Sequence, residues 1–215
     1  MPGPKSLRPL TQRTLSRAVQ ELGERDADLA RIRATAGMPP LRAREPGFAT
    51  LLKIICAQQV STASARAIIA RLDAAYDPLL PAVLVDRGPD ALRALGFSRQ
   101  KADYGIGLAQ AILAGDLDLE AIEALPDDEA VARLVAVKGI GRWTAEIYLL
   151  FALRRPDLWP VDDLAIVSAV CRLKGLEERP GRARMLEIGE SWRPWRSVAA
   201  RLLWHYYNTV PLKAG

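Results

Sequence analysis

The sequence is short of the residues that build metal centres and cross-linked folds. Its 215 residues include two cysteines, Cys56 and Cys171, and one histidine, His205. A four-cysteine iron–sulfur cluster or a closed zinc site needs more ligands than these, so both kinds of site are excluded. Both cysteines lie in apolar helical patterns, and we predict that they are buried free thiols rather than a disulfide.

Long apolar runs are also missing. Half of the residues are hydrophobic, which is sufficient for a core. No stretch, however, approaches the roughly 20 apolar residues that cross a bilayer. The amino-terminal segment MPGPKSLRPLTQRT has no apolar signal core, so we expect an intracellular protein without membrane association, in the cytoplasm and nucleoid or in a eukaryotic nucleus. Residues 1–10 are expected to be disordered or weakly tethered.

Acidic residues are the minority among the charged ones. The 25 acidic side chains against 30 basic ones give a net charge of +5 and a pI near 9.5. This balance is compatible with a polyanionic partner, but many basic proteins bind no nucleic acid. Charge alone therefore leaves the partner open.

Strand-like alternation is absent as well. Apolar residues recur instead at helical spacing and are punctuated by proline, glycine and N-cap residues. We predict an all-α fold of about ten helices, forming one unit over residues 1–215 with two lobes, approximately 48–160 and 1–47 plus 161–215, and a cleft between them. The helices are expected at 11–35 (two, broken near Gly23), 48–56, 61–75, 79–85, 90–95, 98–113, 118–125, 126–137, 142–153, 163–173, 180–190 and 195–208.

Residues 134–170 hold the two motifs that carry chemistry. The first is a tight Gly-Ile-Gly turn at 139–141, between two apolar-periodic segments. Without Cβ atoms, such a turn can present backbone N–H groups at a helix N-terminus to a phosphate. The alternative is an ordinary helix–helix turn, but the context favours a helix-hairpin-helix that binds the nucleic-acid backbone. The residues assigned to this hairpin are Lys138, Gly139, Ile140, Gly141, Arg142 and Thr144.

The second motif is a helix start at 160–163, Pro-Val-Asp-Asp. With the segment 139–145, it resembles the helix-hairpin-helix (HhH-GPD) DNA glycosylase superfamily of base-excision repair, in particular its DNA-3-methyladenine glycosylase II branch. Weaker matches at 54–61 and 194–204 follow in the same order, so the resemblance covers most of residues 45–208. It implies a compact two-lobed helical fold, here without the β-rich N-terminal domain of the bacterial prototype.

The resemblance implies hydrolysis of the N-glycosidic bond of a damaged base in duplex DNA. The family pattern places the catalytic aspartate three residues before an aliphatic position, which Asp163 with Ile166 meets better than Asp162 with Ala165. We assign Asp163 as the carboxylate that stabilises the cationic sugar or orients water. Asp162 is expected to cap the helix or to face solvent. The alternative is that both are ordinary helix-start acids.

Aromatic residues provide the implied base pocket. Trp143 and Trp204 match family positions that stack on a flipped, positively charged base, although each could instead pack in the core. Trp159, Trp192 and Trp195 are expected to be packing residues. In family members that also cut the strand, a lysine nucleophile stands where this chain has Trp143, so the resemblance implies a monofunctional enzyme that leaves an abasic site.

Two departures from the family pattern affect specificity. Ile147 replaces a tyrosine one turn after Trp143, and Tyr148 would point about 100° away from that position. Gln59 replaces the leucine that wedges into the gap left by the flipped base, although it can also be a solvated loop residue. The range of excised bases is therefore left open.

The expected partner is double-stranded DNA with damaged bases, bound by a monomer. No cofactor is required, although the family's hairpin can hold a structural Na+ or K+ through backbone carbonyls, here around residues 137–142. Three other interpretations stay open: a non-catalytic helix-hairpin-helix DNA-binding protein, a glycosylase for oxidised or mismatched bases, and a structural helical domain.

Overall fold

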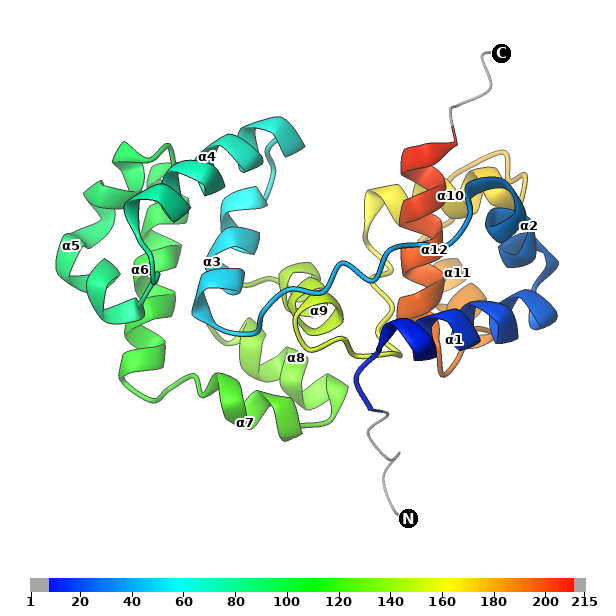
Figure 1. Cartoon of the computed structure of the whole chain (residues 1–215), viewed down its shortest axis with the longest axis horizontal. Coiled ribbons are helices and arrows are strands. Elements are labelled where there is room, and N and C mark those ends of the chain that lie inside the picture. Colours follow the sequence, from blue (N-terminus) through cyan, green and yellow to red (C-terminus); the bar gives the residue numbers. More distant parts are fainter. Residues whose placement is uncertain (1–7, 211–215) are drawn as a thin grey trace. The chain divides into compact units, whose positions relative to one another are not determined.

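The computed structural model describes residues 8–210, and that part of the chain contains twelve α-helices and no strand (Figure 1). The all-α prediction is confirmed, and every helical range expected from the sequence has a counterpart among these twelve, with 79–85 and 90–95 together in α5. The chain divides into two compact units: unit 1 comprises Met1–Ala43 and Arg154–Gly215, and unit 2 comprises Arg44–Leu153.

Unit 2 is continuous in sequence and is built around the apolar helix α3. This helix packs against α4, α6 and α9, while α5 packs along α6 and α8 along α9 (Figure 1). The predicted N-caps Ser61 and Ser98 accept hydrogen bonds from the first turns of α4 and α6. Its helices are α3 (Phe48–Ala57), α4 (Thr62–Ala75), α5 (Pro81–Ala94), α6 (Arg99–Leu113), α7 (Leu119–Ala124), α8 (Asp127–Val135) and α9 (Arg142–Phe151).

Unit 1 joins two helices from early in the chain to three from its last third. The last helix, α12, packs against α1, α2 and α10. The helices of unit 1 are α1 (Gln12–Arg25), α2 (Ala27–Ala36), α10 (Leu164–Leu173), α11 (Arg182–Glu190) and α12 (Arg196–Thr209).

Indole N–H groups tie the two parts of unit 1 together. Trp192 donates to the Asp26 carboxylate at 2.8 Å, and Trp195 donates to Glu21 at 2.6 Å. Trp159 meets Trp192 edge-to-face, with ring centroids 5.2 Å apart. All three indoles are buried, which confirms the prediction that they are packing residues. Burial acts to raise the pKa of Asp26, but the Trp192 hydrogen bond and the charge of Lys174 outweigh it and hold that pKa below its ordinary value.

Several local predictions were wrong. The break within residues 11–35 falls at Asp26, which ends α1 and caps α2, while Gly23 stays helical. The helices expected at 79–85 and 90–95 are both present, however, as the two parts of α5 on either side of Gly88, where the backbone leaves helical geometry with φ +72°. Residues 1–7 lie outside the described part, but Leu10 is fully buried and its N–H donates to the Arg154 carbonyl at 2.8 Å.

Both cysteines are free thiols, as predicted. Cys56 is buried in α3, and burial raises the pKa of its thiol. Cys171 is half-buried rather than buried, and its thiol donates to the carbonyl of Leu176 at 3.3 Å. Within residues 8–210, no three His, Cys, Asp or Glu side chains are grouped so that they can hold a metal ion. No helix in this range combines the length and apolar character that a membrane crossing requires.

Candidate functional site

The hairpin between α8 and α9 contains two glycines with different functions. Gly139 has φ +93°, and a Cβ there would lie 2.3–2.6 Å from the Tyr104 side chain. Gly141 has φ −82°, and nothing lies within 4 Å of where its Cβ would be. Gly139 is therefore needed for internal packing, whereas Gly141 keeps an open surface at the N-terminus of α9. Between them, the buried Ile140 anchors the turn and its N–H donates to the Val137 carbonyl at 3.0 Å.

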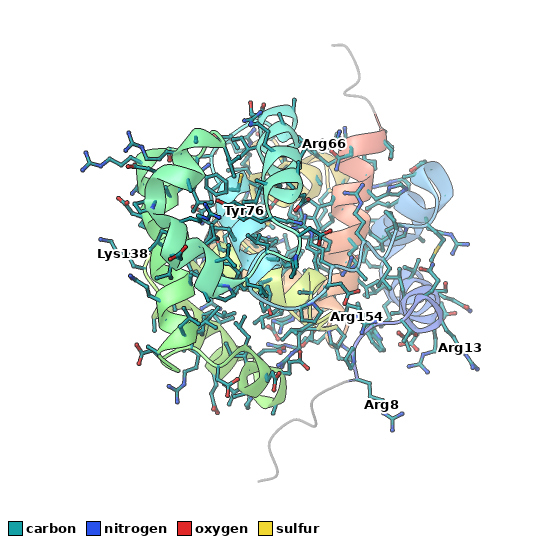
Figure 2. The ribbon with its side chains drawn as sticks, turned by 60° about the vertical axis from the view of Figure 1, so that its left-hand side comes forward. Arg8, Arg13, Arg66, Tyr76, Lys138 and Arg154 are labelled. Carbon is teal, nitrogen blue, oxygen red and sulfur yellow. The ribbon has the colours of Figure 1, made fainter. Side chains whose placement is uncertain are left out.

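The N-terminus of α9 has the chemistry of an anion site. Its N-cap, Gly141, supplies no side-chain acceptor to the first turn, and the N-terminal end of a helix dipole favours an anion. Lys138 is exposed beside the turn (Figure 2). Arg142 is also exposed, but its guanidinium pairs with the buried Glu146 at 2.9 Å, so part of its charge is compensated within α9. This arrangement suits a phosphate, toward which the exposed Lys138 adds a positive charge.

Thr144, also assigned to the hairpin, lies inside unit 2. It is 2% exposed, and its hydroxyl accepts a hydrogen bond from the side-chain amide of Gln58 at 3.0 Å. The same amide donates to the Gly139 carbonyl at 3.0 Å. Thr144 therefore stabilises the hairpin from the interior of unit 2 rather than contacting solvent. Gln58, which links Thr144 to Gly139, was not predicted from the sequence.

Gln59 lies in the turn between α3 and α4. Its side chain is exposed, and its backbone is left-handed with φ +50°. The next residue, Val60, is 39% exposed. A flexible polar side chain followed by an exposed apolar one forms a tip that can enter a base stack, so the structure is compatible with the predicted wedge.

Asp163 is the N-cap of α10. Its Oδ1 accepts hydrogen bonds from the backbone N–H groups of Ala165 and Ile166 and from the indole N–H of Trp204, each at 3.0 Å. The residue is 8% exposed. Asp162, by contrast, has a side chain that is 56% exposed and forms an ion pair with Arg182. Asp163 is thus a buried carboxylate fixed by three donors, whereas Asp162 faces solvent.

The tryptophans assigned to the pocket are both half-buried, in different units. Trp204, in α12, contacts Asp163 directly through its indole N–H. Trp143 lies in the first turn of α9. Tyr148 is fully buried and its hydroxyl accepts the N–H of Gly47 at 2.9 Å, while Ile147 is 6% exposed. Tyr148 is therefore a core residue of unit 2 and does not replace the tyrosine missing at position 147.

Comparison with known proteins finds relatives over most of the chain. The chain is 34% identical to DNA-3-methyladenine glycosylase 1 of Schizosaccharomyces pombe over 165 residues, covering 75% of this chain and 72% of that protein. It is 32% identical to DNA-3-methyladenine glycosylase 2 of Escherichia coli over 199 residues, 85% of this chain and 66% of that protein. Two Bacillus subtilis relatives are matched over 43% and 38% of their length, so the chain spans less than half of them.

A solved structure shares the fold. The Schizosaccharomyces pombe 3-methyladenine DNA glycosylase in complex with abasic DNA superimposes with a TM-score of 0.85 at 30% identity, covering 92% of this chain and 100% of that one. The model of the HhH-GPD superfamily of base excision DNA repair proteins matches residues 52–194, a range that includes the hairpin, Asp163 and the wedge turn. The chain therefore belongs to the HhH-GPD superfamily of base excision DNA repair proteins.

Proposed function

We propose that this protein is a DNA glycosylase of the 3-methyladenine type, acting as a monomer on duplex DNA. The observation that carries the proposal is Asp163, a buried carboxylate fixed by three donors at the start of α10. Its relatives of comparable fold are named for this activity. Two of these donors are ordinary N-cap contacts of α10, whereas the third, the Trp204 indole of α12, is one that capping does not require.

The reaction breaks the bond between C1′ of the deoxyribose and the nitrogen of the base. Because the base is unreachable within the duplex, the nucleotide must first leave the stack. The bonding electrons depart with the alkylated base, and positive charge develops on the sugar. The Asp163 carboxylate stabilises this charge and orients the water that adds to C1′. The proton lost by that water goes to solvent or to the departing base, and an abasic site remains.

The hairpin of unit 2 is proposed to bind the DNA backbone. A phosphate would lie at the N-terminus of α9, where the helix dipole favours an anion and the Gly141 cap has no side chain in the way, and Lys138 would add attraction at longer range. We also propose that carbonyls of residues 137–142 hold a Na+ or K+ ion, for which those of Gly139 and Gly141, each accepting one hydrogen bond, keep a second lone pair. Such an ion would supply positive charge toward the phosphate.

The absence of a lysine at position 143 supports a monofunctional reaction. Strand cleavage through a Schiff base needs an amine at the sugar, and an indole cannot form that adduct. Lys138 precedes the glycines and lies beside the turn, not in α9. We therefore propose that no lyase step follows base release.

The experiment that tests the proposed function is a release assay on methylated duplex DNA. Free 3-methyladenine is expected in the supernatant, and abasic sites should accumulate without strand breaks. The same reaction under borohydride is expected to give no covalent protein–DNA species. If no alkylated base is released, the proposal fails. A trapped adduct would contradict only its monofunctional part. A panel with 7-methylguanine, hypoxanthine and ethenoadenine would show how Ile147 affects the substrate range.

Trp204→Phe is expected to separate the two functions of this indole. Phenylalanine keeps an aromatic face for the base but removes the N–H that donates to Asp163. Loss of one hydrogen bond to a charged group corresponds to a roughly 10- to 100-fold lower single-turnover rate, with affinity for an abasic-analogue duplex nearly unchanged. Trp204→Ala should lower both. A phenylalanine variant as fast as the wild type would show that the indole N–H does not position Asp163.

A further inference from the structure

The turn at Ala57–Val60 is held in a conformation that its own residues do not favour. Gln59 has φ +50°, a region that residues other than glycine adopt rarely and that persists only where the surroundings fix it. The sequence offers no glycine at this position. The contacts that fix the turn must therefore come from other elements of unit 2.

The first fixing contact comes from α6. The ammonium of Lys101 donates to the Cys56 carbonyl at 2.8 Å and also to the Gln58 carbonyl. These carbonyls belong to the C-terminal turn of α3, where helix geometry leaves acceptors unpaired. Burial lowers the pKa of Lys101. Lys101 thus acts as a cationic C-cap of α3.

The second contact comes from the hairpin. The amide of Gln58 donates to the Gly139 carbonyl and to the Thr144 hydroxyl, each at 3.0 Å. Gly139 packs directly on Tyr104, and Thr144 is buried in α9. The Gln58 side chain therefore joins the turn that carries Gln59 to a rigid part of the hairpin.

We propose that Gln58 and Lys101 are positioning residues that fix the Gln59 turn to the phosphate-binding hairpin. The hairpin, which binds the DNA backbone, and Gln59, which inserts into the base stack, then keep a fixed position relative to each other. The proposal rests on the proposed function. Once the hairpin has bound a phosphate, these contacts determine the base step of the DNA strand at which Gln59 inserts. Because small misplacements of a reacting group are costly in rate, a loosened turn would impair base flipping while leaving the hairpin able to bind.

The test uses four variants of the full chain and a matched control. Gln58→Leu keeps the volume of the side chain and removes both donors. Gln58→Asn is milder, since it keeps the amide but retracts it by one methylene. Lys101→Met removes the ammonium, and Lys101→Arg keeps donors for the two carbonyls. The control is Gln110→Leu, the same change at an exposed position of α6.

Three measurements are made on each variant: affinity for undamaged duplex, fluorescence of a 2-aminopurine beside the lesion as a report of unstacking, and the single-turnover rate of base release. For Gln58→Leu and Lys101→Met, we expect unstacking and rate to fall roughly 10-fold, with duplex affinity within about 2-fold of wild type. Lys101→Arg should restore most of the signal, and Gln110→Leu should match wild type.

A double variant tests whether the residues act through Gln59. If they do, adding Gln58→Leu to Gln59→Ala should lower the unstacking signal and the rate little beyond Gln59→Ala alone. The effects of substitutions at residues that act together are not additive. Additive losses, unchanged unstacking in both Gln58 variants, or equal loss of duplex affinity would overturn the proposal. Wild-type base release tests the proposed function separately. The unstacking signal reports on the contacts of Gln58 and Lys101 with the Gln59 turn and the hairpin even if no base is released.

Discussion

Asp163→Asn is expected to abolish base release while leaving the protein folded and able to bind DNA. Asparagine is as good an N-cap as aspartate, and its side-chain oxygen can still accept from Ala165 and Ile166. The charge that would stabilise the cationic sugar is lost. Electrostatic stabilisation of this kind is typically worth a factor of about 10² to 10³ or more in rate. Single-turnover release and fluorescence anisotropy with an abasic-analogue duplex measure the two effects.

Asp162→Asn is the matched control. The Asp162 side chain is exposed and pairs only with Arg182 among the contacts seen for it, and surface pairs of this kind contribute little. Excision should stay within about 2-fold of wild type, since the charge at Asp163 is untouched. If the two variants exchange behaviour, the catalytic assignment is wrong by one residue.

Gly139→Ala is expected to have the second-largest effect, on stability as well as on binding. An alanine there must adopt a positive φ and places its methyl group 2.3–2.6 Å from Tyr104. Backbone strain and overpacking together would lower the free energy of unfolding by about 2–4 kcal/mol. The melting temperature should fall by roughly 5–15 °C, and DNA affinity should fall with it because the hairpin is displaced. Thermal denaturation followed by circular dichroism provides the measurement.

Gly141→Ala makes the same chemical change two residues later. Its φ of −82° suits any residue, and its Cβ would meet no protein atom within 4 Å. The melting temperature should therefore be unchanged. A methyl group on the open surface would, however, stand where a phosphate approaches, so duplex affinity should drop. Equal melting temperatures for both alanine variants would contradict the assignment of internal packing to Gly139 and of an open surface to Gly141.

The parts of the site that could be predicted from sequence are those encoded locally. Asp163 stands at a helix start, and Ser61 and Ser98 cap helices where their residue types indicate. The break between α1 and α2 was misplaced because a glycine looks like a stronger breaker than an aspartate. Asp26 nevertheless ends one helix and caps the next with its own side chain, and Gly23 is compatible with a helix.

The contacts that organise the site join distant residues and were not predictable from spacing. Trp204 was expected to stack on a base, and its hydrogen bond to Asp163 depends on how α12 packs beside the start of α10. Gln58 and Lys101 look like ordinary polar residues of a turn and a helix. Their partners are backbone carbonyls, which every residue has, and a hydroxyl, which several residue types carry. Residue type therefore does not indicate these contacts. Only the folded chain brings these groups together.

The order of the two units along the chain has a consequence for biosynthesis. All of unit 2 is available for folding once Leu153 has left the ribosome. Helices α1 and α2 are synthesised before unit 2, yet the indoles that bind Asp26 and Glu21 are synthesised after it. Helices α1 and α2 therefore remain without these partners while unit 2 is synthesised. Unit 1, with Asp163 capped and Trp204 in place, can therefore be completed only after all of unit 2 has been synthesised.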